Sequence, residues 1–247
     1  MSNNRAVRIA VVLGACVALA ACAGAPVDER PVVRIVEAAQ PSPAIPLGRF
    51  LPSAQELSAT LGTGPHGFLG QLVEGDADML LRTVGDAQAT PHDCVGTAYR
   101  LQKIVYDATP VRSVASSSWA GGEFDGPPVS GFFGVVQMES TADADEFFAA
   151  TTDDWRRCNG QTVVLQQPGL GADEVSRISD VGFDRRVVSA SVLHASAGSA
   201  SAPGMRALGV VGDCIVDVEL SDPRAGGGAS PAIGVAKLIL DKIAAQR

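Results

Sequence analysis

The clearest structural signal in this 247-residue chain is the sequence MRALGVVGDCIVDVEL, at residues 205–220. Two runs rich in valine, leucine and isoleucine, residues 205–211 and 214–220, are separated only by Gly212 and Asp213. Glycine adopts positive φ angles without strain, so two such residues between two apolar runs predict a tight β-hairpin. The sequence therefore indicates an antiparallel pair of strands near the C-terminus.

Four segments upstream of this hairpin also have β-strand character. They are apolar and are bounded by turn-forming residues, and they lie at residues 111–119, 132–138, 162–166 and 185–194. The Ser/Ala/Gly-rich residues 195–204 are expected to form a loop between strands. Sequential strands with short links predict a twisted, mainly antiparallel sheet.

Two helices are expected from their terminal signals. Ser53 and Glu56 have the spacing of a capping box, and Gly62 marks the end of the short helix that follows. A C-terminal helix is expected to start at Ser230, with Pro231 in its first turn. Both helices carry apolar residues that can face a core.

A third helix is expected near the middle of the chain, with Ser140 or Thr141 as its N-cap. Its apolar residues recur at steps of three and four: Ala144, Phe147, Phe148, Thr151, Trp155 and Cys158. Helices at the start, middle and end of the domain are expected to cover the apolar face of the sheet. The predicted fold class is α+β, as a single domain.

The N-terminal residues have the features of a bacterial lipoprotein signal. Arg5 and Arg8 precede the uncharged, apolar residues 9–21, and the sequence LAAC at residues 19–22 fits a lipobox. We expect export, cleavage before Cys22 and attachment of lipid to its thiol, with localisation at the outer face of the cell membrane. The alternative is an ordinary secretory signal in which this cysteine occurs by chance.

The segment after Cys22 is expected to be a semi-extended tether, because it is rich in proline and has little apolar periodicity. The prolines are Pro26, Pro31, Pro41, Pro43 and Pro46. The expected organisation is a signal peptide at residues 1–21, a lipidated tether at 22–49 and one folded domain at 50–247.

Charge excludes one class of function. The whole chain has a net charge of −8, and removing residues 1–21 removes two of its 19 basic side chains and none of its 27 acidic ones, which leaves −10. Such a surface repels phosphate backbones, so we do not expect a nucleic-acid partner.

The cysteines predict one disulfide. With Cys16 in the signal peptide and Cys22 lipidated, the exported domain keeps Cys94, Cys158 and Cys214. Disulfides persist outside the cytoplasm, so one pair and one odd thiol are expected. We predict a Cys94–Cys158 bond, because Cys158 ends the apolar face of the middle helix and Cys94 follows a turn. Cys214 is expected to be a buried free thiol.

Several short motifs together resemble the PknH-like extracellular sensor domain family. They are FLPSAQEL at residues 50–57, DCVG at 93–96 followed by Tyr99, WRRC at 155–158, and the closing hairpin. The resemblance covers roughly residues 50–246. That family occurs on a mycobacterial serine/threonine kinase and on several envelope lipoproteins. It implies an α+β domain with a groove thought to bind an unidentified envelope ligand, and it provides no catalytic residues. The family usually has a second disulfide bracketing the hairpin, whose cysteines this sequence lacks.

No motif in the sequence specifies a catalytic or metal site. GTGPHG at residues 62–67 fits a glycine-rich phosphate loop only formally, because it follows a predicted helix and not a strand. His66, His92 and His194 are far apart, and nothing in the sequence indicates that a triad forms. The residues His92-Asp93-Cys94 are too closely spaced for a typical zinc site, so we expect a structural turn, no catalytic residue, no metal and no cofactor.

A Gly/Pro-rich loop is the best candidate for ligand binding. It runs from Ala120 to Gly131, and Trp119 and Phe124 lie at its edge. Such aromatic residues suit either the rim of a cleft or packing within the loop.

We therefore expect a non-catalytic binding or sensor module, anchored outside the membrane by lipid, with an unknown envelope ligand or protein partner. An interaction protein in a larger envelope assembly is the first alternative, and it would present an exposed apolar patch. An enzyme of unrecognised type is the second, and it would need titratable groups converging in a cleft.

Overall fold

The structure is a computed structural model, and it describes residues 44–63, 67–85, 88–122, 126, 128–166, 173–196, 203–224 and 228–247. The chain divides into two units, Met1–Ala38 and Ala39–Arg247, and every described residue lies in the second. The expected signal peptide, Cys22 and most of the tether fall outside the described residues, as do His66 and Phe124.

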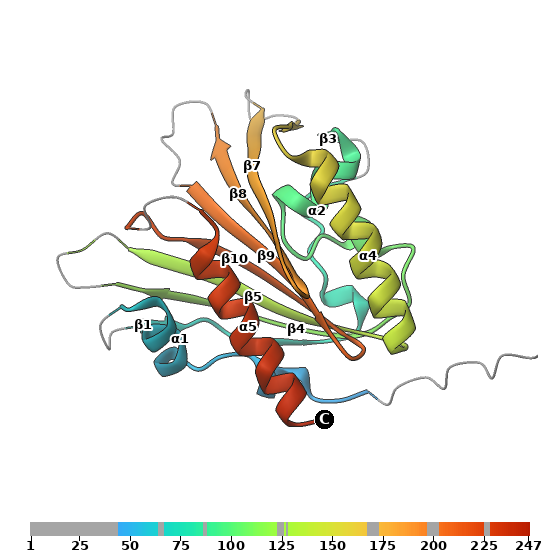
Figure 1. Ribbon diagram of the computed structural model, residues 1–247, viewed down its shortest axis with the longest axis vertical. Helices are drawn as coiled ribbons and strands as arrows, with labels where there is room; N and C mark the ends of the chain where they lie inside the picture. The colour runs from blue at the N-terminus through green and yellow to red at the C-terminus, as the bar shows by residue number, and fades with distance from the viewer. Residues whose placement is uncertain are drawn as a thin grey trace, which may run out of the picture. The chain divides into compact units, whose positions relative to one another are not determined.

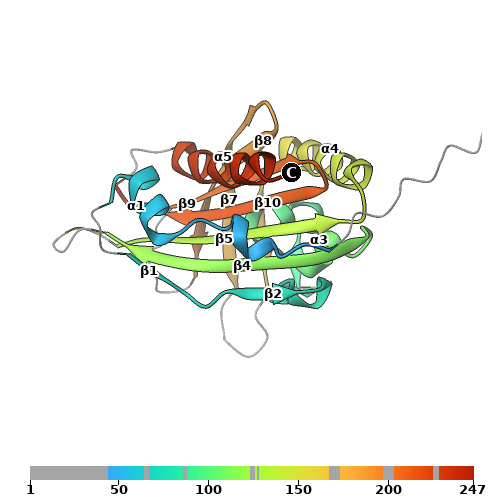
Figure 2. The same cartoon turned by 90° about the horizontal axis from the view of Figure 1, so that it is seen from below.

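Ten strands form one sheet in the order β1-β4-β5-β10-β9-β8-β7-β6-β3, and β2 also pairs with β4. The strands are β1 Gly67–Leu69, β2 Val73–Gly75, β3 Ala89–Thr90, β4 Val111–Gly121, β5 Val129–Met138, β6 Thr162–Leu165, β7 Glu174–Asp184, β8 Val187–Ala195, β9 Pro203–Val211 and β10 Cys214–Ser221. Neighbouring strands run antiparallel throughout. Figure 2 shows β10, β5 and β4 as successive neighbours.

The predicted hairpin is confirmed and occupies the middle of the sheet. It consists of β9 and β10, with Cys214 paired to Val211 across the turn. Gly212 has a φ of 56°, in the left-handed region where glycine is not strained. Because β5 and β8 flank the hairpin, it organises both halves of an antiparallel α+β domain, the expected fold class.

Three long helices lie where their caps predict them: α1 (Ala54–Leu61), α4 (Thr141–Cys158) and α5 (Ser230–Ala245). Ser53 and Glu56 form the capping box, and the Ser140 hydroxyl accepts a hydrogen bond from the Asp143 N–H at 3.2 Å. The remaining helical segments are short. They are η1 Leu47–Phe50, η2 Ala77–Met79, η3 His92–Cys94, α2 Val95–Ala98 and α3 Lys103–Tyr106.

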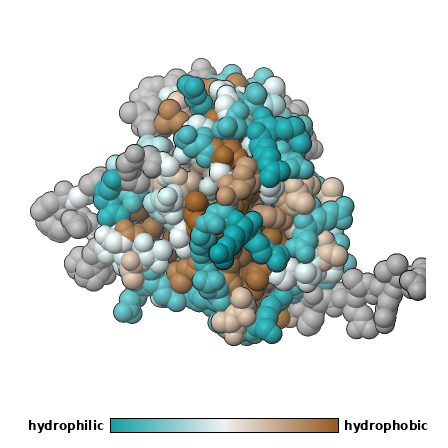
Figure 3. Space-filling view, viewed as in Figure 1, coloured by the Kyte–Doolittle hydropathy of each residue, from teal (hydrophilic) through white to brown (hydrophobic). Residues whose placement is uncertain are grey.

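Helices cover both faces of the sheet. Along β10, Val216 and Val218 belong to one apolar core together with α1 and α5, whereas Ile215 belongs to another together with α2, α3 and α4. We call the side of α1 and α5 the closed face and the side of α2, α3 and α4 the open face. Figure 1 shows α5 and α4 on either side of β9, and in Figure 3 hydrophilic residues cover the outer side of α4.

The structure differs from the sequence analysis at three points. The strand expected at residues 185–194 begins at Val187, because Arg185, with a φ of 56°, lies in the turn before it. The strand β7 was not expected, because its apolar residues alternate poorly and its pairing shifts register between Ser179 and Gly182. The packed region also extends upstream of residue 50, since Leu47 is fully buried in the core of the closed face.

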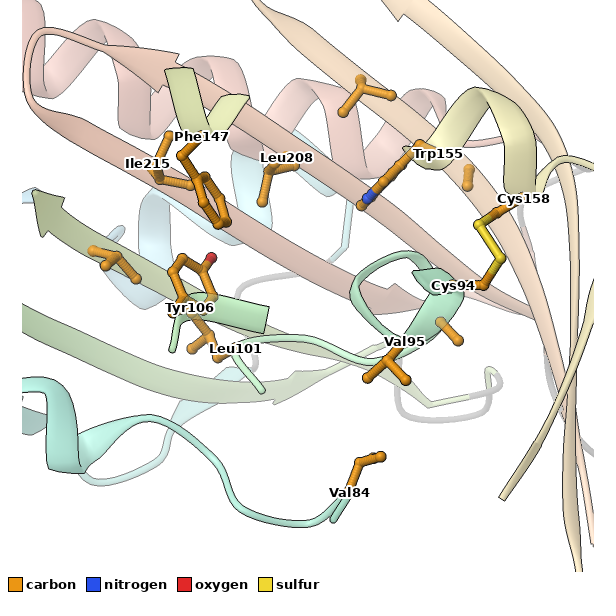
Figure 4. Close-up of a cluster of buried hydrophobic side chains, with 14 of the residues drawn as sticks. Val84, Cys94, Val95, Leu101, Tyr106, Phe147, Trp155, Cys158, Leu208 and Ile215 are labelled. Carbon is orange, nitrogen blue, oxygen red and sulfur yellow. A yellow bond between two sulfur atoms is a disulfide. The ribbon is translucent and has the colours of Figure 1, made fainter. Parts of the chain in front are cut away.

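A disulfide joins Cys94 and Cys158, the pair expected from the sequence. Their Cα atoms lie 5.6 Å apart, and the bond connects the start of α2 to the end of α4 (Figure 4). It therefore fixes the short α2 segment, which has little packing surface of its own, against the long helix on the open face.

Candidate ligand-binding cleft

Two neighbouring hollows on the open face share Arg100 and Glu219 in their walls, and we call the two together the cleft. The first hollow has a volume of about 470 Å³, and its wall includes Phe68, Leu69 and Phe132. The guanidinium of Arg100 lies 4.0 Å from the centre of the Phe132 ring and donates a hydrogen bond of 2.8 Å to Glu219. This hollow therefore combines an apolar wall with a charged pair.

The second hollow, of about 330 Å³, is polar. Tyr99 Oη lies 2.9 Å from Ser176 Oγ, which lies 2.8 Å from His194 Nδ1, and Glu174 Oε1 lies 3.4 Å from the same nitrogen. Burial raises the pKa of Tyr99 to about 12. Burial also lowers the pKa of His194, although nearby carboxylates oppose it. At neutral pH this hollow presents neutral tyrosine and imidazole groups beside a carboxylate.

A buried arginine lies beneath the cleft. Arg206 is fully buried; it donates hydrogen bonds to Asp217 at 2.8 Å and to the Gly96 carbonyl at 3.2 Å, and forms an ion pair with Glu219 at 3.5 Å. Burial alone would raise the pKa of Glu219, but Arg206 and Arg100 outweigh it and hold that pKa below its usual range. Glu219 therefore remains an anion between two cations.

The backbone that carries Arg100 is held in an unusual conformation. The next residue, Leu101, has a φ of 47°, which is strained for a residue with a branched side chain. Its N–H donates to Asp217 at 2.8 Å, and its carbonyl accepts from the Leu81 N–H at 2.8 Å. Gly134 leaves room for its side chain, because a Cβ there would lie 2.4 Å from Leu101 Cδ1. These contacts together fix the position of Arg100 at the cleft.

The Ser176–His194–Glu174 cluster does not have the geometry of a catalytic triad. In a triad the base uses one ring nitrogen for the nucleophile and the other for the carboxylate. Here Ser176 and Glu174 both contact Nδ1 of His194. Ser176 is also fully buried, so its hydroxyl cannot reach a substrate. The cluster is suited to hydrogen bonding and not to nucleophilic attack.

Of the two aromatic residues expected at the binding site, the structure describes Trp119 but not Phe124. Trp119 contributes to the wall of the apolar hollow, but its side chain is only 2% exposed and packs in the core of the closed face. Phe124 lies outside the described residues. The aromatic surface presented to the cleft comes instead from Phe68, Tyr99 and Phe132.

The remaining sequence-predicted residues lie away from the cleft. Cys214 is a free, buried thiol whose pKa burial raises to about 12. His92 is exposed and precedes the disulfide-bonded Cys94. Among the described residues, no three His, Cys, Asp or Glu side chains are grouped so that they could hold a metal ion.

Sequence reasoning missed the charged residues of the cleft, although a signal was present. Within β10, Asp217 and Glu219 alternate with Val216, Val218 and Leu220, and Arg206 lies opposite Glu219 on β9. Charged residues at every second position of a central, covered strand predict a polar site on one of its faces. Tyr99 and Glu174 had no such signal, because long-range folding brings them to this strand.

Two solved structures resemble the fold. The crystal structure of the extracellular domain of PknH from Mycobacterium tuberculosis matches with a TM-score of 0.68 and 20% sequence identity, covering 84% of this chain and 99% of that one. The X-ray structure of a putative uncharacterized protein from Mycobacterium smegmatis matches with a TM-score of 0.39 and 12% identity, covering 78% and 96%. The first likeness shows that the two chains share a fold.

The family comparison covers most of the chain. No curated protein matches it significantly. The PknH-like extracellular domain family, however, matches residues 42–242, a range that contains the disulfide and every described residue of the cleft. The chain therefore belongs to the PknH-like extracellular domain family.

Proposed function

We propose that the protein is a non-catalytic binding module, held outside the membrane by lipid on Cys22, and that its cleft binds a small envelope molecule. The observation that carries this proposal is the two-part cleft that meets at Arg100 and Glu219. Membership in an extracellular-domain family supports the extracytoplasmic location.

The cleft offers both apolar contact and directional hydrogen bonding. Phe68 is 80% exposed and Leu69 is 45% exposed at its apolar end. The polar end provides Tyr99, Glu174 and His194. Ligand sites typically combine apolar walls with a few fixed polar groups that set orientation. The mixed charges favour a ligand with both donors and acceptors over a simple anion.

The cleft lacks the features that catalysis would need, which supports the non-catalytic part of the proposal. Its histidine and serine do not form a triad, and the serine is buried. Its strongest ion pairs are formed among the protein's own groups, since Arg206 pairs with Asp217 and Arg100 with Glu219. Such pairs can orient a ligand without transferring protons to it.

Native mass spectrometry of the full chain, before and after incubation with a chloroform–methanol extract of the cell envelope, tests ligand binding. We expect a discrete added mass that is lost on denaturation. Arg100→Met should abolish this added mass, because it removes the group shared by both hollows. Arg186→Met, which removes an exposed arginine paired with Asp145, should leave it unchanged. Equal binding by both variants would contradict the proposed site.

The lipid anchor needs a separate test, because it depends only on the N-terminal sequence. In the part of the chain that the structure describes, no helix is long and apolar enough to cross a membrane. We expect the wild-type protein expressed in its native type of host to enter the detergent phase of a phase-separation assay. Cys22→Ser should remain in the aqueous phase, and detergent partitioning of this variant would contradict anchoring through Cys22.

An apolar patch favours a second function, as an interaction protein in an envelope assembly. It follows the sheet edge at β1, β2 and η2 and consists of Phe68, Leu69, Leu72, Val73 and Met79, all between 37% and 80% exposed. Exposed patches of this kind mark interaction sites. Val73→Ser combined with Met79→Ser lies outside the cleft, so it should abolish a stable complex seen by size-exclusion chromatography while leaving ligand binding intact.

A further inference from the structure

Three serine hydroxyls lie close together in the apolar hollow of the cleft. Ser130 on β5 pairs with Ser221 on β10, and Ser118 lies on the neighbouring strand β4. All three line the hollow, and none of them is buried. No described residue forms a hydrogen bond with any of these hydroxyls. Because a hydroxyl both donates and accepts hydrogen bonds, the hollow offers a ligand three groups of either kind.

The floor around these hydroxyls is open because its other side chains are small. Ala120 pairs with Ser130, and Gly204 pairs with Ser221, so this row across four strands has no side chain larger than serine. The ring of His194 borders the row, since its Nε2 would lie 3.7 Å from a Cβ at Gly204. The other ring nitrogen makes the contacts described above. A ligand can therefore reach the serine hydroxyls from above the sheet.

The wall beside this floor presents an exposed aromatic ring. Phe68 on β1 pairs with Ala120 and is 80% exposed. The second phenylalanine of the hollow, Phe132, is covered by the guanidinium of Arg100 at 4.0 Å, so Phe68 offers the larger exposed surface. The face of an aromatic ring carries partial negative charge and attracts C–H groups that neighbouring oxygen atoms polarise. Phe68 therefore suits the C–H face of a saturated, oxygen-bearing ring.

The charges of the apolar hollow balance each other. Among its described lining residues only Arg100 and Glu219 are charged, and they pair at 2.8 Å. A ligand with a net charge would be attracted by one of them and repelled by the other. The pair instead places N–H donors beside a carboxylate acceptor, which suits a ligand group that both donates and accepts. An acyl chain, in contrast, would cover the serine hydroxyls without giving them partners, which costs free energy.

We infer that the cleft binds a neutral saccharide, an inference that rests on the binding function proposed above. One sugar ring stands on the floor of the apolar hollow with its C–H face against Phe68. Its hydroxyls exchange hydrogen bonds with the three serines and with the Arg100–Glu219 pair. A saccharide carries hydroxyls on successive carbon atoms, and each of them donates and accepts, as the closely spaced groups of the floor require. The volume of about 470 Å³ suits a mono- or disaccharide.

The test uses the full chain and the envelope extract of the ligand-binding experiment in three forms: untreated, passed over an anion exchanger, and oxidised with periodate. Periodate cleaves the bond between neighbouring carbons that both carry hydroxyls, which saccharides contain and acyl chains lack. We expect the added mass in native mass spectrometry to survive the anion exchanger, which removes phospholipids with acidic headgroups, and to be lost after periodate.

Each other outcome contradicts a different statement. An added mass that survives periodate would overturn the saccharide and leave the binding function standing. An added mass that the anion exchanger removes would overturn the neutral ligand in the same way. No added mass from the untreated extract would overturn the binding function and this inference together.

A matched pair of serine variants tests the placement of the sugar. Ser130→Ala combined with Ser221→Ala should lower the ratio of bound to bare protein about tenfold at a sub-saturating amount of extract, the size expected for losing two hydrogen bonds. Ser179→Ala combined with Ser191→Ala removes a pair of neighbouring serines outside both hollows and should change the ratio by less than about twofold. Equal ratios for the two double variants would overturn the placement.

The aromatic contact has its own control. Phe68→Ser should lower the same ratio about tenfold through the lost stacking surface. Phe183→Ser removes another exposed phenylalanine, on β7 and outside the cleft, and should leave the ratio unchanged. Undiminished binding by Phe68→Ser would overturn the contact between the sugar ring and this wall.

Discussion

Along β10, Val216 and Val218 face the apolar side chains of α5, whereas Asp217 and Glu219 face the cleft and its arginines. The closed face is covered by the amphipathic helix α5, and its contacts at Val216 and Val218 are apolar. The open face is covered by α4 and by short segments, and it keeps buried charges. The same strand thus contributes stability on one side and binding chemistry on the other, and both the disulfide and the fully buried Arg206 belong to the open face.

The largest effect is expected from removing the disulfide of the open face. Cys94→Ser combined with Cys158→Ser releases a loop of 64 residues, which should lower the free energy of unfolding by about 4 kcal/mol in the chain-entropy model. Because Tyr99 and Arg100 follow Cys94 closely, ligand binding should also be lost. Urea unfolding of the oxidised wild type and the variant measures the first effect, and native mass spectrometry the second.

Cys214→Ala is the matched control, because it removes a cysteine that is buried on the closed face and makes no disulfide. It should cost about 1 kcal/mol at most, as a small truncation in an apolar core. If it destabilised the chain as much as the disulfide variant, the contrast between the two faces would not rest on the covalent link.

The next largest effect is expected from the buried arginine. Arg206→Met leaves the Asp217 carboxylate buried without its main partner and should cost about 3 kcal/mol. Adding Asp217→Leu removes the unpaired charge and should restore much of this loss. Urea unfolding of the wild type, both single variants and the double variant gives the coupling free energy between the two groups.

A truncation on the closed face is the control for this coupling measurement. Ile239→Ala, on α5, should cost about 3 kcal/mol through lost packing. It should show no coupling to Asp217→Leu, since the two side chains lie on opposite faces of the sheet. Strong coupling between them would mean that the faces do not act independently.

The closed face was largely predictable from sequence, because its signals are local. The capping box at Ser53, the Pro231 start of α5 and the Gly212 turn each depend on residues close together in the chain, and each appears as expected. The two apolar cores follow from the alternation within β10. What local patterns could not give was the sheet order, in which β5 pairs with β10 across about 80 residues.

The open face was predictable only in part. The disulfide could be inferred by counting the cysteines that remain in the exported domain. The short α2 and α3 segments, in contrast, have no apolar periodicity of their own and form because tertiary contacts hold them. Leu101 adopts a left-handed backbone conformation although it is neither glycine nor asparagine, the residues that would predict one. The Asp217 carboxylate, on a distant strand, stabilises this conformation by accepting a hydrogen bond from the Leu101 N–H. Cleft residues therefore come from many separate parts of the chain between Phe68 and Ser221, which single-sequence patterns do not connect.

A smaller effect is expected from the N-cap of α1. Ser53→Ala removes the hydroxyl that accepts the Glu56 N–H, and it should lower the free energy of unfolding by about 1 kcal/mol. Because α1 packs on the closed face, ligand binding in the cleft should not change. Ser53→Thr keeps the acceptor and should be close to wild type, and a loss of binding in Ser53→Ala would show that the two faces are coupled.

The smallest effect concerns the pH dependence of the polar hollow. Burial lowers the pKa of His194, so the unfolded chain binds a proton there at higher pH than the folded chain does. The stabilising contribution of neutral His194 should therefore be complete above about pH 6.5 and be lost as the pH falls through the folded pKa. The free energy of unfolding from urea titrations at pH 7.5 and pH 5 measures this loss.

His194→Gln keeps a polar group at the end of β8 and should reduce the loss of stability between these two pH values. His92→Gln, at an exposed site outside the cleft, should leave it unchanged. If His194→Gln lost more stability than the wild type between these pH values, the carboxylates of Glu174 and Glu219 would outweigh burial and His194 would be a cation. The polar end of the cleft would then suit an anionic group, and the cleft as a whole would favour an amphipathic anion over the ligand with both donors and acceptors proposed above.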